Sequence, residues 1–179
     1  MPAMKRAIVI AVLAMGVAVG GAEEAKMQFT LSSPSFQNNQ PMPAKHSCEG
    51  MDVSPALNWD GVPANAKGFA LICDDPDAPG GTWVHWVIYG IPAGTTELPE
   101  NVAKTDSANG AKQGVNDFGR VGYGGPCPPP GRVHHYHFRL YALDAELNLA
   151  PRVSRRQLES AMKGHIVAQT ELVGTYQRE

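Results

Sequence analysis

Carboxylates and a histidine gather in one short segment, DDPDAPGGTWVHW at residues 74–86. The acids precede a strand-like run in which His85 and Trp83 alternate with apolar residues, so both side chains lie on one face. An enclosed imidazole needs partners for its ring nitrogens, and a nearby carboxylate such as Asp75 or Asp77 is a usual one. This segment alone equally fits a turn whose aspartates cap backbone amides, beside a satisfied core histidine.

A second polar group begins the segment GYGGPCPPPGRVHHYHFRLYAL at residues 122–143. His134 and Tyr136 share one face with the apolar residues that follow them, which places two polar tips at the edge of a core. Gly124 and Gly125 stand just before them and allow the backbone to turn its N–H groups toward an anion. The segment therefore predicts a pocket at the start of a strand.

Other reactive side chains have simpler interpretations. His135 and His137 lie on the opposite face of that strand. We expect them to be an outward, solvated pair and not the ligands of a metal ion. Cys73 ends an apolar run, which indicates a buried thiol. Cys48 and Cys127 lie in Gly/Pro-rich loops, so we favour a disulfide between them, with free thiols as the alternative.

Apolar runs bounded by Gly or Pro provide the elements that position these groups. Their aromatic and β-branched residues indicate strands. One helix is expected to begin after Ser154 with a capping box and to stop at Gly164. A turn-rich stretch between Pro92 and Gly125 has few apolar residues, and we expect a long surface loop. The expected strands cover residues 27–31, 67–73, 83–91, 133–143 and 165–176, and the helix covers residues 155–163.

Length and composition limit the class of protein. The chain has 179 residues, enough for one domain with a real core. Hydrophobic residues make up 43% and charged residues 18%, a globular balance that excludes a disordered chain, and 19 Gly with 15 Pro favour a β-rich, loop-heavy fold. The formal net charge of -2 argues against a nucleic-acid-binding protein.

The N-terminus has the layout of a secretory signal peptide. Lys5 and Arg6 precede an apolar run at residues 7–19, and small residues end at Ala22. The run is shorter than the ~20 residues that span a bilayer, so we expect cleavage and no stable membrane anchor. We therefore expect a signal peptide at residues 1–22, one domain at residues 23–179, and a periplasmic or secreted protein.

Together with CEGMDVSPALNW at residues 48–59, the two polar segments resemble the phosphatidylethanolamine-binding protein family, in its bacterial Raf-kinase-inhibitor-like branch. DPDAP before a Trp/His strand, and GGPCPP before an H-x-Y strand, carry the resemblance. It implies a mainly β fold of Greek-key antiparallel sheets with a few short helices, and a small pocket for anions. It assigns to that pocket Asp75, Asp77, His85, Gly125, Pro126, His134 and Tyr136, with Trp83 and Trp86 as aromatic positions around it.

The resemblance favours an exported binding protein for a small anion or a phospholipid head group, without a cofactor. In this interpretation Asp75 and Asp77 orient and charge the histidines, or one of them stays protonated. The resemblance also raises the modulation of a protein partner, such as a kinase or a protease. Two alternatives use the same groups: a hydrolase that activates water, and a transition-metal site built from Asp75, Asp77, His85 and His134.

Overall fold

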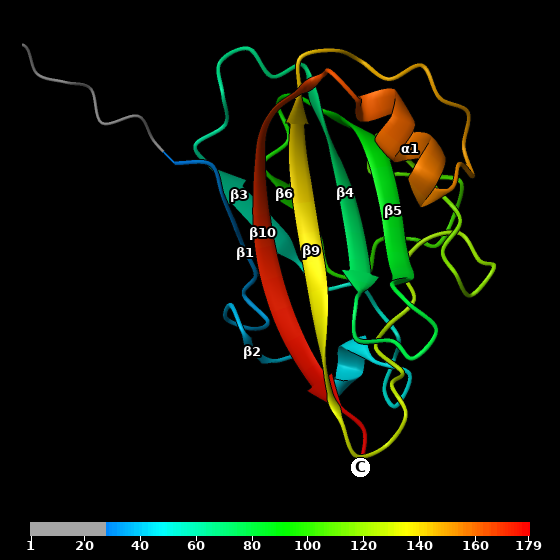
Figure 1. The fold of residues 1–179 in the computed structure, drawn as a ribbon. Coiled ribbons are helices and arrows are strands. Elements are labelled where there is room, and N and C mark those ends of the chain that lie inside the picture. Colours follow the sequence, from blue (N-terminus) through cyan, green and yellow to red (C-terminus); the bar gives the residue numbers. More distant parts are fainter. Residues whose placement is uncertain (1–27) are drawn as a thin grey trace, which may run out of the picture.

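Two β-sheets that pack against each other form the frame of the protein. The computed structural model describes residues 28–179, and its four long strands β10, β9, β4 and β5 run side by side with the smaller sheet behind them (Figure 1). Neighbouring strands are antiparallel except for a short parallel pair between β2 and β10. This confirms the expected mainly β, antiparallel-rich fold. The smaller sheet has the spatial order β1 (Thr30–Ser32), β3 (Leu57–Asp60), β6 (Glu97–Leu98). The larger sheet has the spatial order β2 (Gln40–Pro41), β10 (Ile166–Gln177), β9 (Val133–Leu143), β4 (Gly68–Asp75), β5 (Trp83–Pro92), β8 (Ala111–Gln113), β7 (Ser107–Ala108).

The main core lies between the two sheets. Every residue of β4 is buried, because one face of this central strand packs on the smaller sheet and the other lies under the helix. Phe69 on β4 meets Trp59 on β3, with ring centroids 5.5 Å apart. Burial of large apolar side chains at about 25 cal/mol per Å² is what stabilises this pairing of sheets. The apolar residues on both faces of β4 fit this two-sided burial.

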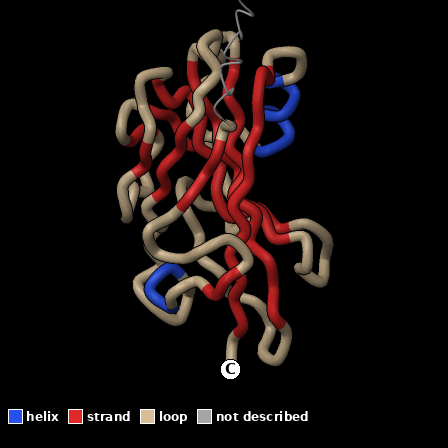
Figure 2. Tube along the Cα trace, turned by 90° about the vertical axis from the view of Figure 1, so that its left-hand side faces the viewer, coloured by secondary structure: helices blue, strands red, loops and turns tan. Residues whose placement is uncertain are grey.

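The helix α1 (Arg155–Met162) covers the outer face of the larger sheet, and the short 3-10 helix η1 (Ala44–His46) lies near the other end of the molecule (Figure 2). The expected capping box is present: the Gln157 amide donates to the Ser154 hydroxyl, and the Gln157 side chain accepts from the Ser154 amide. Leu158 and Met162 point from α1 into a second apolar cluster.

The expectation of a surface loop between Pro92 and Gly125 is wrong. This stretch contains β6, β7 and β8, and it buries Leu98, Val102 and Tyr123. Gln113 is also buried, because its side chain accepts a hydrogen bond from the Trp86 indole at 2.7 Å and donates to backbone carbonyls. Because this stretch is held in place by such long-range polar contacts, its sequence does not show the periodic apolar pattern of a buried element.

The expected signal peptide at residues 1–22 lies outside the described residues, as does the start of the first expected strand. Within residues 28–179, no helix is long and apolar enough to cross a membrane.

Candidate functional site

Three strand ends converge on one pocket at the edge of the core between the sheets. β4 ends at Asp75, which pairs in register with Trp83 at the start of β5. The start of β9 lies on the other side of β4, where Asp74 pairs with His137. Because antiparallel neighbours place the end of one strand beside the start of the next, residues far apart in sequence meet here.

The pocket is a cavity of about 220 Å³ with a polar floor and apolar walls. Trp83, 38% exposed, stands at its mouth, whereas His85, His134 and Tyr136 are buried. Trp86 does not line it; this indole packs in the core beside Tyr123. The lining residues are Asp75, Ala78, Pro79, Trp83, His85, Phe118, Cys127, Pro128, Pro129, His134 and Tyr136.

Asp75 and His134 form a buried pair. The imidazole Nδ1–H donates to Asp75 Oδ2 at 2.7 Å, and both side chains are almost completely buried. The other carboxylate oxygen accepts the backbone amide of Asp77 at 2.8 Å. Both oxygens of Asp75 are thus engaged, and the bond to Nδ1 fixes the ring so that Nε2 is the nitrogen left for a ligand.

His85 is held by the backbone instead of by a carboxylate. Its Nδ1–H donates to the Gly124 carbonyl at 2.7 Å. Burial lowers the pKa of His85 below its ordinary value, although that hydrogen bond and the charge of Asp75 oppose the effect. Of the two pocket histidines, only His134 has its ring oriented by Asp75, while the Gly124 carbonyl orients His85.

Tyr136 contributes a hydroxyl that has no hydrogen-bond partner among the described residues, although it is buried. Its ring meets the His85 ring edge to face, with centroids 5.0 Å apart. Burial and the nearby Asp75 carboxylate raise the pKa of Tyr136 well above its usual value, so the group is a protonated donor. A buried donor without an acceptor costs about 1–3 kcal/mol, which a ligand oxygen would offset.

Asp77 points away from the cavity. Its Oδ2 accepts both the backbone amide of His135, at 2.9 Å, and the imidazole Nδ1–H of the same residue, at 2.7 Å. These contacts fasten the Asp-Pro-Asp turn to β9. The hydrogen bond from the His135 side chain is also the main reason why the pKa of Asp77 is lowered. The structure thus gives this residue a positioning role.

The glycine pair does not present free amides to the cavity, contrary to the sequence-based expectation. The Gly124 amide donates to the His85 carbonyl at 2.9 Å, and the Gly125 amide donates to Asp52 Oδ1 at 2.6 Å. Gly125 is required by a close approach, because a Cβ there would lie 2.2 Å from the His46 carbonyl oxygen. Pro126 lies behind the lining, where its carbonyl accepts the Cys48 amide.

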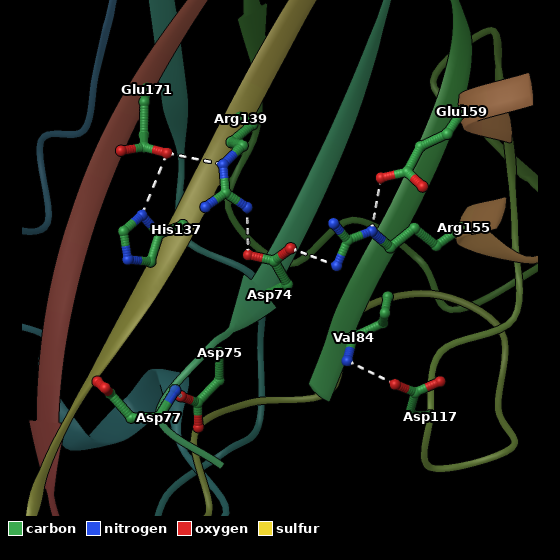
Figure 3. A network of polar contacts seen from close by, with 10 residues as sticks. All are labelled: Asp74, Asp75, Asp77, Val84, Asp117, His137, Arg139, Arg155, Glu159 and Glu171. Atoms are coloured by element: carbon green, nitrogen blue, oxygen red, sulfur yellow. Dashed lines mark hydrogen bonds and ion pairs between the residues drawn. The ribbon is translucent and has the colours of Figure 1, made fainter. Parts of the chain in front are cut away.

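Phe118 is a pocket residue that sequence reasoning missed. Its ring lies 5.5 Å from Trp83 and 5.3 Å from His85, centroid to centroid. Asp117 holds this loop on the edge of β5, because its side chain accepts the Val84 amide at 2.7 Å (Figure 3) and its own amide donates to the Val84 carbonyl. An Asn-Asp turn signals a loop, but nothing local signals where the loop docks.

The expected disulfide joins Cys48 and Cys127, and Cys73 is a buried free thiol. Cys127 lines the cavity, so the bridge ties the pocket loop to the loop that follows η1.

Asp74, next to Asp75, belongs to a separate polar network on the opposite face of β4 (Figure 3). Its carboxylate pairs with Arg139 on β9 and, at 2.7 Å, with Arg155 on α1. The Glu171 carboxylate on β10 lies 2.8 Å from Arg139 Nε and 3.1 Å from His137 Nδ1. The network fastens α1 and three strands together and does not reach the cavity.

The sequence-based alternative of a metal site gains no geometric support. Across the described residues, no group of three His, Cys, Asp or Glu side chains is arranged to hold a metal ion. His135 and His137 each pair with a different carboxylate, Asp77 and Glu171.

Comparisons with known proteins match most of the chain to one family model, to curated relatives and to solved structures. Residues 32–177 match the family model described as phosphatidylethanolamine-binding protein. A UPF0098 protein of Pyrococcus horikoshii is 51% identical over 174 residues, covering 95% of this chain and 86% of that relative. The crystal structures of the phosphatidylethanolamine-binding protein homolog CT736 from Chlamydia trachomatis and of Escherichia coli YbcL each give a TM-score of 0.79, at 39% and 35% identity. They cover 86% and 84% of this chain, and 99% of each neighbour is matched.

Proposed function

Because this chain belongs to the phosphatidylethanolamine-binding protein family, we propose that it is an exported binding protein whose pocket holds a small anion, such as the phosphate of a lipid head group. The observation that carries the proposal is the buried Tyr136 hydroxyl, which has no hydrogen-bond partner in the described part of the chain and lies in the same cavity as two imidazoles. A phosphate oxygen accepts from all three groups when the histidines are protonated. Apolar walls around this floor strengthen each contact by excluding water.

The ligand chemistry favours binding over catalysis. The Asp75–His134 pair has the form of a general base, which is the specific feature that favours the hydrolase alternative. The cavity lining contains no Ser or Thr hydroxyl, and the sulfur of Cys127 is in the disulfide, so none of these groups can serve as a covalent nucleophile. Activation of water by the pair is left to the measurement of phosphate release. We therefore propose that the paired imidazole orients and neutralises a bound anion.

Calorimetric titration tests the proposal. The ligands are phosphoethanolamine and inorganic phosphate, which separate a head-group requirement from plain anion binding. His134→Ala should weaken phosphoethanolamine binding roughly tenfold to hundredfold, the value of about 1.5–3 kcal/mol for a charge-assisted hydrogen bond. His165→Ala removes an exposed histidine that pairs with Asp144 and should leave the affinity unchanged.

Two outcomes contradict the binding proposal. Equal affinity in wild type and His134→Ala would mean that the anion binds elsewhere. Steady release of inorganic phosphate from phosphoethanolamine by wild type, abolished in His134→Ala, would favour the hydrolase.

Export is the second part of the proposal. It is supported by the leader-like residues 1–22 and by a disulfide between two exposed cysteines, which persists in oxidising compartments. N-terminal sequencing of the protein recovered outside the cytoplasm should begin near Glu23. A sequence that still begins at Met1 would refute cleavage.

A further inference from the structure

A second concavity lies beside the pocket, and nothing above assigns it a role. It is an open groove of about 650 Å³, within the roughly 300–1,000 Å³ of typical ligand sites. Val115 and Val121, both half-buried, line it with apolar surface, and the almost fully buried Tyr123 lies beneath them. Cationic side chains also line it: Lys104, Arg120 and Arg152.

Arg120 is unpaired among residues 28–179, and the other two cations keep N–H donors that their ion pairs do not use. Lys104 pairs with Asp52 at 2.6 Å, and Arg152 uses its Nε–H for Asp106 at 2.9 Å, which leaves its two terminal amino groups. Arg120 forms no ion pair with any residue between 28 and 179, and its guanidinium lies over the Phe118 ring, 5.5 Å from the centroid. One carboxylate, Asp106, also lines the groove, so its three cations leave an excess of positive charge there on a chain of net charge -2.

The backbone at Arg152 supports a role for its side chain. Its φ is +69°, in the left-handed region where glycine is favoured and an arginine is strained by about 1 kcal/mol or more. The exposed pair with Asp106 compensates little, because surface ion pairs contribute about 0–1 kcal/mol. Stability alone would favour glycine at this position.

The groove and the pocket are neighbours that share a wall. Phe118 lines the pocket, and Arg120 stacks on it from the groove. No lining residue is common to both cavities. Occupancy of one therefore does not require occupancy of the other.

We propose that this groove binds an acidic peptide segment of a protein partner, with an apolar side chain against Val115 and Val121 and carboxylates on Lys104, Arg120 and Arg152. An open groove that combines apolar and cationic lining fits an extended peptide better than a single inorganic anion, because an anion would leave the two valines uncovered. The inference does not depend on what the pocket binds.

The test uses fluorescence anisotropy with the oxidised mature protein and a labelled peptide Glu-Asp-Leu-Glu-Asp. Its amide counterpart, Gln-Asn-Leu-Gln-Asn, controls for charge. The acidic peptide should bind more tightly, and added salt should weaken its binding. Arg120→Gln and Arg152→Gly should each weaken it about fivefold, while thermal denaturation shows Arg152→Gly to be at least as stable as wild type. Arg156→Gln, which removes an exposed charge on α1, should bind like wild type.

Three results would overturn the proposal. The first is equal binding of the acidic and amide peptides. The second is an equal loss in Arg156→Gln and Arg120→Gln, which would reflect net charge alone. The third is charge-dependent binding to phosphatidylglycerol vesicles without peptide binding, which would make the groove a membrane contact. Phosphoethanolamine affinity, measured on the same variants, reports separately on the pocket.

Discussion

Asp74 and Asp75 are adjacent aspartates on β4, both almost fully buried, yet they serve different regions. The strand turns Asp74 toward α1, where two arginines from separate elements neutralise it. Asp75 faces the cavity and pairs with one imidazole, while the Tyr136 hydroxyl beside it has no partner within residues 28–179. The charge of Asp74 is compensated by two guanidinium groups and holds elements together, whereas a partnerless hydroxyl that lines a cavity indicates a ligand site.

The largest expected effect is on stability and comes from the polar network around Asp74. Asp74→Ala leaves the guanidinium groups of Arg139 and Arg155 without their shared carboxylate, so we expect the free energy of unfolding to fall by about 3 kcal/mol. Phosphoethanolamine affinity of the folded variant should stay within about twofold of wild type, because Asp74 does not line the cavity. Urea denaturation and calorimetry measure the two quantities.

Glu159→Ala is the matched control. This exposed residue pairs with Arg155 at 2.7 Å at the edge of the same network, and its loss should cost less than about 0.5 kcal/mol. Equal losses of stability in the two variants would mean that the buried carboxylate of Asp74 stabilises the protein no more than the exposed carboxylate of Glu159.

The same two faces show how far sequence could predict the structure. Alternation along residues 133–143 correctly put His134 and Tyr136 on the core face, and the capping box correctly placed α1, because both signals are local. The docking of Phe118 and the engagement of the Gly125 amide by Asp52 are contacts between distant segments. Local periodicity does not encode such contacts, so the free-amide nest and the surface loop were wrongly predicted.

The affinity of the pocket for an anion should depend on pH through His85. Burial lowers its pKa, so the ring is neutral at pH 7 and must take up a proton to donate from Nε2 to an anion. Affinity for phenyl sulfate, whose charge is constant, should therefore rise as pH falls from 8 toward 5, by up to about tenfold per unit. Calorimetry over that range measures the slope, and His85→Gln should flatten it. If the pH dependence of affinity were unchanged in that variant, a group other than His85 would take up the proton.

Tyr136→Phe separates stability from binding. The lost hydroxyl has no hydrogen-bond partner among the residues that the structure describes. We therefore expect stability to be unchanged or higher by about 1 kcal/mol, while phosphoethanolamine affinity falls about fivefold. Tyr123→Phe removes a buried hydroxyl that donates to the His46 carbonyl at 2.9 Å, so it should do the reverse and cost about 1 kcal/mol of stability. Similar behaviour of the two variants would contradict a ligand role for Tyr136.

The smallest expected effect concerns Asp77, which lies between the two regions and touches neither the arginine network nor the cavity. The hydrogen bond from His135 lowers its pKa below 3.8, so its stabilisation is present above about pH 4 and is lost as pH falls through the lowered value. Both side chains are more than a third exposed in this pair, and screening by solvent keeps the contribution below about 1 kcal/mol. Acid denaturation of Asp77→Asn should therefore show a slightly weaker pH dependence between pH 4 and 2 than wild type. Phosphoethanolamine affinity at pH 7 should stay within about twofold, because the turn retains the hydrogen bond from the Asp77 amide to Asp75. A tenfold loss of affinity in Asp77→Asn would instead make this carboxylate part of the binding site.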